Sequence, residues 1–261
     1  MHRPTSGVVV NAHVRRILED ATHRLVFRRR LPPPFHGVRL YATTEGGLRY
    51  LRPSLREIDP PLLAVAHRYV KRGSVVWDVG ANLGLFTLPA AEAVGPTGAV
   101  VAIEADAWMA TLLRRSVQLN DWSERVDVLA AACTDAFGIG TFEIASRSRS
   151  TNHLAGFGST QTGGVRERQM VPLVPLDALL DDHRPPDVLK IDVEGAEVLV
   201  LEGAAKVLEH RPLMIIEVAG ENSHMVRSII EPHGYEFFDG EHLEAGLVDE
   251  LPYMTVAAPK A

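Results

Sequence analysis

Acidic side chains stand at the ends of several apolar segments of this sequence. A carboxylate at the end of a buried strand is costly unless it is paired, hydrogen-bonded or bound to a metal. In α/β proteins the carboxyl ends of parallel strands meet in one crevice, where ligands bind. We therefore expect one shared site; the alternative for each residue alone, that it caps the next helix, explains the set less well. The carboxylates are those of Asp78, Glu104, Asp192, Glu194 and Glu217.

A glycine-containing turn, Gly80-Ala81-Asn82-Leu83-Gly84, follows the first apolar segment and precedes a helical one. Glycine allows a sharp turn and close approach of a ligand, and the next helix points its first N–H groups at that ligand. A dinucleotide site requires Gly-x-Gly-x-x-Gly, but Asn82 stands in place of the second glycine. Asp78 would repel a pyrophosphate and neutralise an amino or sulfonium group. The turn therefore favours S-adenosylmethionine over NAD.

Glu104 supports a nucleoside-containing ligand. It lies 24 residues after Gly80, at the end of the second apolar strand segment. In doubly wound nucleotide-binding folds an acidic residue at about this spacing hydrogen-bonds the ribose hydroxyls. We expect Glu104 to bind a ribose.

Strand and helix signals alternate along most of the chain. Such repeated units predict an α/β fold, a doubly wound and mainly parallel sheet with helices on both faces. Strands are expected at residues 75–79, 99–104, 126–132, 187–192 and 213–218, with a terminal antiparallel pair at 235–238 and 253–257. Helices are expected at 60–69, 85–94, 107–119, 175–180 and 225–231, and one ending near 209.

The polar segment 145–168 is too long for an ordinary connection. It is rich in Ser, Thr, Gly and Arg and follows a short strand expected at 142–144. A loop of this length is either disordered or a functional lid.

Composition indicates one globular α/β domain with an appendage, divided here into residues 1–54 and 55–261. The chain is 46% hydrophobic and 23% charged, which is ordinary for a globular protein. No apolar run approaches ~18–20 residues, so we expect no membrane span. The single cysteine, Cys133, excludes an internal disulfide and a cysteine-based zinc site, and it fits a cytoplasmic location.

The N-terminal part is basic, while the remainder is acidic. Residues 1–56 hold 11 Lys/Arg against 3 Asp/Glu, a net +8, so the rest carries −14 to give the total of −6. Residues 8–29 show helical spacing of apolar side chains, and residues 37–52 read as a hairpin turning at Glu45-Gly46-Gly47. We expect the helix to pack on the domain or to form a homodimer; membrane-surface or nucleic-acid binding are the alternatives.

Two motifs resemble the FkbM family of S-adenosylmethionine-dependent methyltransferases. They are Asp78-Val79-Gly80-Ala81-Asn82-Leu83-Gly84 and the more specific Leu189-Lys190-Ile191-Asp192-Val193-Glu194-Gly195-Ala196-Glu197. The similarity runs from about residue 55 to 240. It implies a seven-stranded, Rossmann-like methyltransferase sheet and methylation of a small-molecule hydroxyl on a sugar, polyketide or other specialised metabolite. The sequence departs from the family at Glu104-Ala105-Asp106, where Glu-Pro is usual.

The resemblance implies cofactor-binding roles for particular residues. Asp78 and Gly80 would hold the methionine moiety, Asn82 and Gly84 would shape the turn, and Glu104 would bind the ribose. Ala105 or Trp108 would line the adenine, and Asp135, after the third strand, would contact its amino group.

Asp192 is our first choice for the base that deprotonates the acceptor hydroxyl, and it would also lie beside the cofactor. His153, in the polar segment, is the second choice, and Glu217 is a further catalytic candidate. Asp192, Glu194 and Glu217 together would suit Mg²⁺, which prefers oxygen ligands, unless Glu194 only caps the next helix.

Three other functions remain as alternatives. An NAD-dependent oxidoreductase lacks its glycine fingerprint here. A methyltransferase acting on RNA or another macromolecule would use the basic N-terminal part, but the Asn/Asp-Pro-Pro-aromatic turn of amino-group methylases is replaced by Asp192-Val193-Glu194-Gly195, so we expect no nucleic-acid partner. A non-catalytic cofactor-binding module would not need Asp192 and Glu217.

Overall fold

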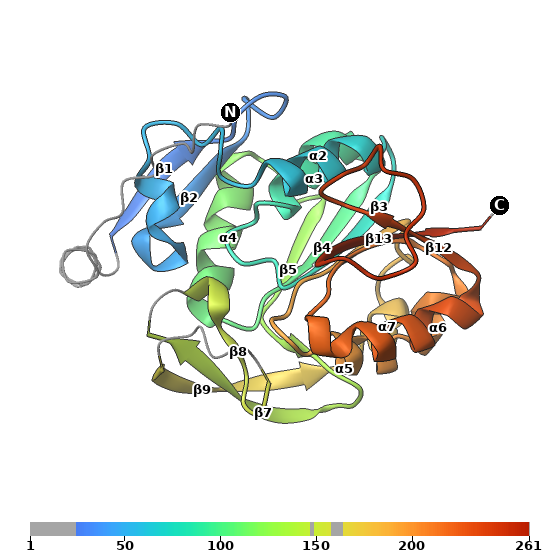
Figure 1. Cartoon of the computed structure of the whole chain (residues 1–261). Coiled ribbons are helices and arrows are strands. Elements are labelled where there is room, and N and C mark those ends of the chain that lie inside the picture. The colour runs from blue at the N-terminus through green and yellow to red at the C-terminus, as the bar shows by residue number, and fades with distance from the viewer. Residues whose placement is uncertain (1–24, 147–148, 158–163, 261) are drawn as a thin grey trace, which may run out of the picture.

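A seven-stranded sheet forms the centre of the protein (Figure 1). The computed structural model describes residues 25–146, 149–157 and 164–260. All neighbouring strands of this sheet are parallel except where β13 meets β11 and β12. In spatial order the strands are β12 (Tyr235–Asp239), β13 (Met254–Pro259), β11 (Leu213–Glu217), β10 (Val188–Ile191), β3 (Val75–Val79), β4 (Ala99–Ile103) and β5 (Val126–Leu129).

Both faces of the sheet are covered. Alternate side chains of β3 point to opposite faces of the sheet: Val76 packs in one apolar cluster, whereas Val75 and Trp77 pack in the other. The first cluster includes side chains of α2 (Pro60–Tyr69), α3 (Thr87–Val94) and α4 (Ala107–Leu119). The second includes α5 (Glu197–Glu202), α6 (Ala205–Glu209), α7 (Ser223–Ile230) and the 3₁₀ helix η6 (Leu176–Asp181). The predicted doubly wound α/β fold is confirmed.

A second, four-stranded sheet includes both ends of the segment expected to be a loop. Its order is β6 (Ala132–Cys133), β9 (Val165–Val174), β7 (Gly138–Ala145) and β8 (His153–Leu154), with the 3₁₀ turn η4 (Arg149–Thr151) before β8. The short strand predicted at 142–144 is part of the longer β7. Of the two alternatives for residues 145–168, disorder was wrong for the described ends, because Ala145 and residues 165–168 belong to the paired strands β7 and β9; a functional lid stays a prediction.

The described N-terminal part forms a two-stranded ribbon; the hairpin prediction was wrong, and the helix prediction was wrong for its described end. The last residues of the helix expected at 8–29 form β1 (Val26–Arg30), and β1 pairs with β2 (Arg39–Thr43). The expected hairpin at 37–52 does not form, since β2 is followed by the 3₁₀ turns η1 (Thr44–Gly46) and η2 (Leu48–Leu51). The rest of the predicted helix, and a homodimer through it, lie outside the described residues.

Packing on α4 explains the ribbon. Leu40 and Ala42 are fully buried on one side of β2, and the backbone N–H of Tyr41 donates to Ser116 Oγ at 2.9 Å. A strand buried on one face needs a partner strand for its backbone groups, and β1 supplies it. The remaining 3₁₀ turns are η3 (Gly95–Thr97), η7 (Gly220–Asn222) and η8 (Glu231–His233).

The chain reverses direction across the sheet between β3 and β10. After β3 it proceeds to β4 and β5 on one side, and it returns to β10 and β11 on the other. Such a switch point opens a crevice at the carboxyl ends of the strands. Among the helices of the described residues, none is long and apolar enough to cross a membrane.

The two strand ends at the switch point touch at Gly80. Its φ of +78° is rarely adopted by other residues, and a Cβ there would lie 1.7 Å from the backbone oxygen of Asp192. The loops after β3 and β10 can therefore approach one another only because residue 80 lacks a side chain.

We expect Gly80→Ala to lower the free energy of unfolding by about 3 kcal/mol, because the backbone of one strand end must move and a positive φ must be kept. Denaturant unfolding measures this. Gly220→Ala is the matched control, since a Cβ at Gly220 meets nothing within 4 Å. Equal stability of the two variants would show that the strand ends are not in this close contact.

Candidate functional site

A buried lysine organises the carboxyl ends of β3 and β10. Lys190 lies beside Asp78 in the parallel pairing of these strands and is only 3% exposed. Its Nζ donates to the backbone oxygen of Gly80 at 2.9 Å and to Asp192 Oδ2 at 3.2 Å, and it lies 3.2 Å from Asp78 Oδ1. Burial lowers the pKa of Lys190, but the carboxylates of Asp192 and Asp78 outweigh burial and raise it above the ordinary value. The site therefore contains a fixed ammonium.

Asp78 is held behind this lysine. It is fully buried, and Thr87 Oγ1 donates to its Oδ2 at 2.5 Å. Asp78 is absent from the residues that line the two cavities described below. The structure thus places Asp78 where it positions Lys190, and a direct contact with the methionine moiety stays a prediction.

Glu104 closes the turn after β3 against the end of β4. Its Oε2 accepts from the backbone N–H of Asn82 at 2.7 Å, and its Oε1 accepts from that of Asp106 at 2.7 Å. Burial raises the pKa of Glu104 to about 7. Each carboxylate oxygen keeps a second lone pair, so Glu104 can also accept from ligand hydroxyls.

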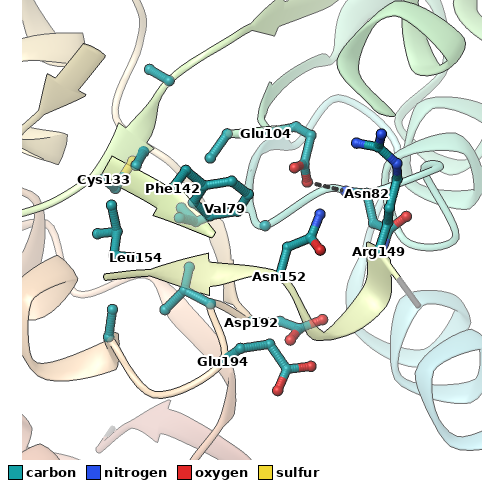
Figure 2. A pocket seen from close by; sticks show the side chains of 16 residues that line it. Val79, Asn82, Glu104, Cys133, Phe142, Arg149, Asn152, Leu154, Asp192 and Glu194 are labelled. Atoms are coloured by element: carbon teal, nitrogen blue, oxygen red, sulfur yellow. Dashed lines mark hydrogen bonds between the residues drawn. The ribbon is translucent and has the colours of Figure 1, made fainter. Parts of the chain in front are cut away.

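A narrow cavity, called here the inner cavity, opens beside Glu104. Figure 2 shows its apolar end at Cys133, Phe142 and Leu154 and its polar end at Glu104 and Asn82, with the Asp192 and Glu194 carboxylates along one side. Burial raises the pKa of the Cys133 thiol to about 12, so this sulfur is a neutral wall rather than a nucleophile.

The four-stranded sheet and the η4 turn before β8 roof the inner cavity. Arg149 lines it and is 7% exposed. Arg149 lies 2.5 Å from Asp106 Oδ2 and 3.1 Å from Glu45 Oε2, and Asn152 Nδ2 donates to Asp106 Oδ2 at 2.8 Å. The cavity measures about 60 Å³, well below the roughly 300 Å³ or more of small-molecule sites. The inner cavity is therefore narrower in this structure than a bound nucleoside requires.

A wider cavity of about 330 Å³, the outer cavity, lies on the other side of the turn. Its walls come from α2, the residues before it, and the strand ends of β10, β11 and β13. The charged residues lining it are Arg49, Asp59, Lys190, Asp192, Glu194, Glu217 and Glu241. Arg49 lies 3.9 Å from Asp59, and Lys190 is already paired with Asp78 and Asp192. The acidic residues that line the outer cavity therefore outnumber its basic residues.

The two cavities meet at a small group of residues. Gly80, Asn82, Asp192 and Glu194 line both of them. Asn82 has a positive φ of +50° and Glu194 one of +52°, so each of the two turns holds a residue in the left-handed region. A group transferred from one cavity to the other would pass here.

Carboxyl groups around the junction hold protons more tightly than usual. Burial, with the nearby Asp192 carboxylate, raises the pKa of Glu194 to about 8 and that of Glu217 to about 7. The hydroxyl of Tyr253 donates to Glu217. An excess of buried negative charge is the condition that a cationic ligand relieves.

Asn82 gives an independent sign that a polar ligand fits. Its Oδ1 is buried and has no hydrogen-bond partner in the part of the chain that the structure describes. A buried acceptor without a donor costs free energy, and a ligand ammonium or amino group at the junction would satisfy it. The residues present therefore suit S-adenosylmethionine, with an apolar end for a base, Glu104 for ribose hydroxyls and carboxylates for positive charge.

Several predicted site residues lie away from both cavities. Gly84 packs against Leu113, Trp108 packs against the apolar core, and Asp135 is exposed after β6. His153 is buried in β8, where its Nε2 lies 3.5 Å from Glu143 Oε2. Of the predicted residues, the structure brings together Gly80, Asn82, Glu104, Ala105, Asp192, Glu194 and Glu217.

The predicted magnesium site has no support in the structure. Across residues 25–146, 149–157 and 164–260, no group of three or more His, Cys, Asp or Glu side chains could hold a metal ion. Asp192 instead contacts the ammonium of Lys190. The ammonium of Lys190 thus takes the place beside Asp192 where Mg²⁺ was predicted.

Sequence reasoning missed Lys190, Arg149, Asn152 and Tyr253 as parts of the site. Only Lys190 carries a local signal, because it interrupts a strand that is otherwise apolar and a buried lysine needs carboxylate partners. Arg149 and Asn152 are polar residues in a polar segment, so nothing nearby distinguishes them.

Known proteins resemble this chain in sequence pattern and in fold. Residues 78–237 match the sequence profile of the methyltransferase FkbM domain. Methyltransferase FkbM from Methylobacillus flagellatus KT is 13% identical with a TM-score of 0.44; the match covers 75% of this chain and 50% of that one. The chain thus spans about half the length of that protein. No curated protein matches.

Two further solved structures match this chain. Precorrin-6y C5,15-methyltransferase from Geobacter metallireducens GS-15 is 15% identical with a TM-score of 0.46, and the match covers 76% of this chain and 86% of that one. The SAM-dependent O-methyltransferase from Thermotoga maritima is 16% identical with a TM-score of 0.46, and the match covers 78% of this chain and 66% of that one.

We expect the free energy of unfolding of the ligand-free protein to fall as pH rises from about 5 to 8. The pKa of Glu194 is about 8 in the folded protein against an ordinary 4.5, so the folded state binds more protons than the unfolded chain in this window, and raising the pH favours unfolding. Chemical denaturation at several pH values measures the slope. Glu194→Gln should flatten it and the exposed Glu124→Gln should not; an unchanged slope in Glu194→Gln would contradict the raised pKa.

Proposed function

The chain belongs to the methyltransferase FkbM domain family, and on that premise we propose that it transfers a methyl group from S-adenosylmethionine to a hydroxyl group of a small molecule. A sugar, a polyketide or another specialised metabolite is the acceptor class. The observation that carries this proposal is the meeting of the inner and outer cavities at Gly80, Asn82, Asp192 and Glu194.

The inner cavity suits the nucleoside end of the cofactor. Cys133, Phe142 and Leu154 offer apolar contact to a flat base, and Glu104 offers acceptors to two ribose hydroxyls. The carboxylates of Asp192 and Glu194 then face the positively charged end. S-adenosylmethionine supplies a methyl group already activated by its sulfonium.

The outer cavity suits an acceptor without negative charge. Glu194, Glu217 and Glu241 line it, and none of them has an ion-pair partner within the described residues. Carboxylates accept hydrogen bonds from hydroxyl or ammonium groups, but they repel phosphate and carboxylate groups. The proposed acceptor is therefore a neutral or cationic polyhydroxyl compound.

Asp192 is the proposed base. An attacking hydroxyl must lose its proton as the new bond forms, so a base has to lie at the junction of the cavities. Asp192 lines both, and Lys190 fixes its carboxylate at 3.2 Å. Correct alignment of the reacting groups supplies much of the rate in such a displacement. Glu217, touched by Tyr253, lies in the outer cavity as a second candidate.

We expect calorimetric titration to show binding of S-adenosylmethionine and S-adenosylhomocysteine but not of NAD. Glu104→Gln should weaken S-adenosylhomocysteine binding at least about 10-fold, because a charge-assisted acceptor for ribose hydroxyls is lost. Glu124→Gln, at an exposed carboxylate, should bind like the unchanged protein. Preferential binding of NAD would overturn the proposed function, whereas an unaffected Glu104→Gln would remove only the role of Glu104.

We expect Asp192→Asn to reduce kcat at least about 100-fold, the usual size of a lost general base, while S-adenosylhomocysteine affinity stays within about threefold. Turnover of a hydroxylated acceptor found by a mass-shift screen measures kcat, and calorimetry measures affinity. Asp181→Asn, at an exposed aspartate, is the control. If Asp192→Asn keeps its turnover while Glu194→Gln or Glu217→Gln loses it, the base is that glutamate.

A further inference from the structure

An arginine-lined hollow lies on the N-terminal ribbon and is separate from the two cavities described above. It measures about 510 Å³, and it shares no lining residue with the inner or outer cavity. Besides its arginines it is lined only by prolines, leucines and one serine in the described part of the chain, so no carboxylate lines it there. The arginines are Arg28, Arg29, Arg30, Arg39 and Arg56.

Strand pairing brings two of these charges directly opposite one another. Arg30 of β1 is the partner of Arg39 of β2 in the antiparallel register. Like charges at such positions destabilise a strand pair. The ribbon therefore carries a repulsion that a bound anion would relieve.

The arginines are positioned by neutral groups. Arg29 donates to the backbone oxygens of Arg52 and Pro53, and Arg39 donates to that of Leu119. Arg28 donates to the hydroxyl of Tyr41 at 3.3 Å, and this contact lowers the pKa of Tyr41. These bonds hold the guanidinium groups in place without cancelling their charge.

No carboxylate of the described residues pairs with the arginines of the hollow. None of the five arginines forms an ion pair with an acidic group among the described residues. Arg30 and Arg56 are exposed, and among the described residues the one hydrogen bond of Arg56 comes from its backbone N–H. They are thus available to a ligand from outside.

We propose that the arginine hollow is a second binding site, which takes a ligand bearing two adjacent phosphate groups. The fork of a guanidinium group matches phosphate oxygens in pairs, and five arginines exceed what one phosphate needs. The described lining contains no aromatic side chain. Binding of single-stranded nucleic acid usually depends on aromatic stacking platforms, so a diphosphate-bearing small molecule fits better than RNA.

Inorganic diphosphate is the probe, titrated calorimetrically into the full chain saturated with S-adenosylhomocysteine. We expect saturable binding at least about 10-fold tighter than that of orthophosphate, since two charged groups are held instead of one. The double variant Arg30→Gln/Arg56→Gln should bind diphosphate at least about 10-fold more weakly. The double variant Arg72→Gln/Arg184→Gln removes the same charge from exposed positions outside the hollow and should bind normally.

Three results would overturn the proposal. Absence of saturable diphosphate binding would show that the hollow is not a binding site. An equal loss of diphosphate affinity in both double variants would show that binding depends only on the overall charge of the protein. The third result is that a single-stranded RNA oligomer binds more tightly than diphosphate. If that binding is lost in Arg30→Gln/Arg56→Gln and falls more steeply with salt than diphosphate binding, the hollow is a nucleic-acid site instead. Retained S-adenosylhomocysteine binding in the double variants shows that the methyltransferase site is unaffected.

Discussion

The ammonium of Lys190 is the constraint on which the rest of the site depends. A lysine in the middle of a buried strand is tolerated only with full compensation, and here Asp78, Asp192 and the carbonyl of Gly80 provide it. These partners come from β3, from the turn after it and from the end of β10. One charge therefore fixes the relative positions of the two loops that separate the inner from the outer cavity. The carboxyl groups beyond this one cation, Glu194 and Glu217, keep their protons to a higher pH than usual, and a cationic ligand at the junction would favour their ionised form.

The inner cavity is completed by parts of the chain that are remote in sequence. Arg149 joins Asp106, at the start of α4, to Glu45 of the η1 turn, and Figure 1 shows the small sheet lying below the edge of the large one. Buried ion pairs of this kind contribute position more than net stability. The small sheet is thus tied to α4 and to the η1 turn. This contact keeps Phe142 and Leu154 at the apolar end of the inner cavity.

The central fold could be predicted from the sequence because its signals are local. β3, β4, β10 and β11 are short apolar runs, and α2 and α4 have clear starts in Pro60-Pro61 and in the cap at Asp106. The ribbon could not, since β1 is a strand only through its pairing with β2 and the packing of β2 on α4. Helical spacing in residues 8–29 carried no information about that contact. The same holds for the site: Glu104 and Asp192 are marked by the strands they follow, whereas Arg149 acquires its role from a fold made by residues 138–174.

The close contact between Gly80 and the backbone of Asp192 has a thermodynamic consequence. Both residues line the inner and the outer cavity, so each of them faces whatever fills either one. A molecule that shifts them from one cavity changes the work of filling the other. Such linkage is reciprocal: a ligand in either cavity would alter the affinity of the other cavity for its own ligand by the same factor.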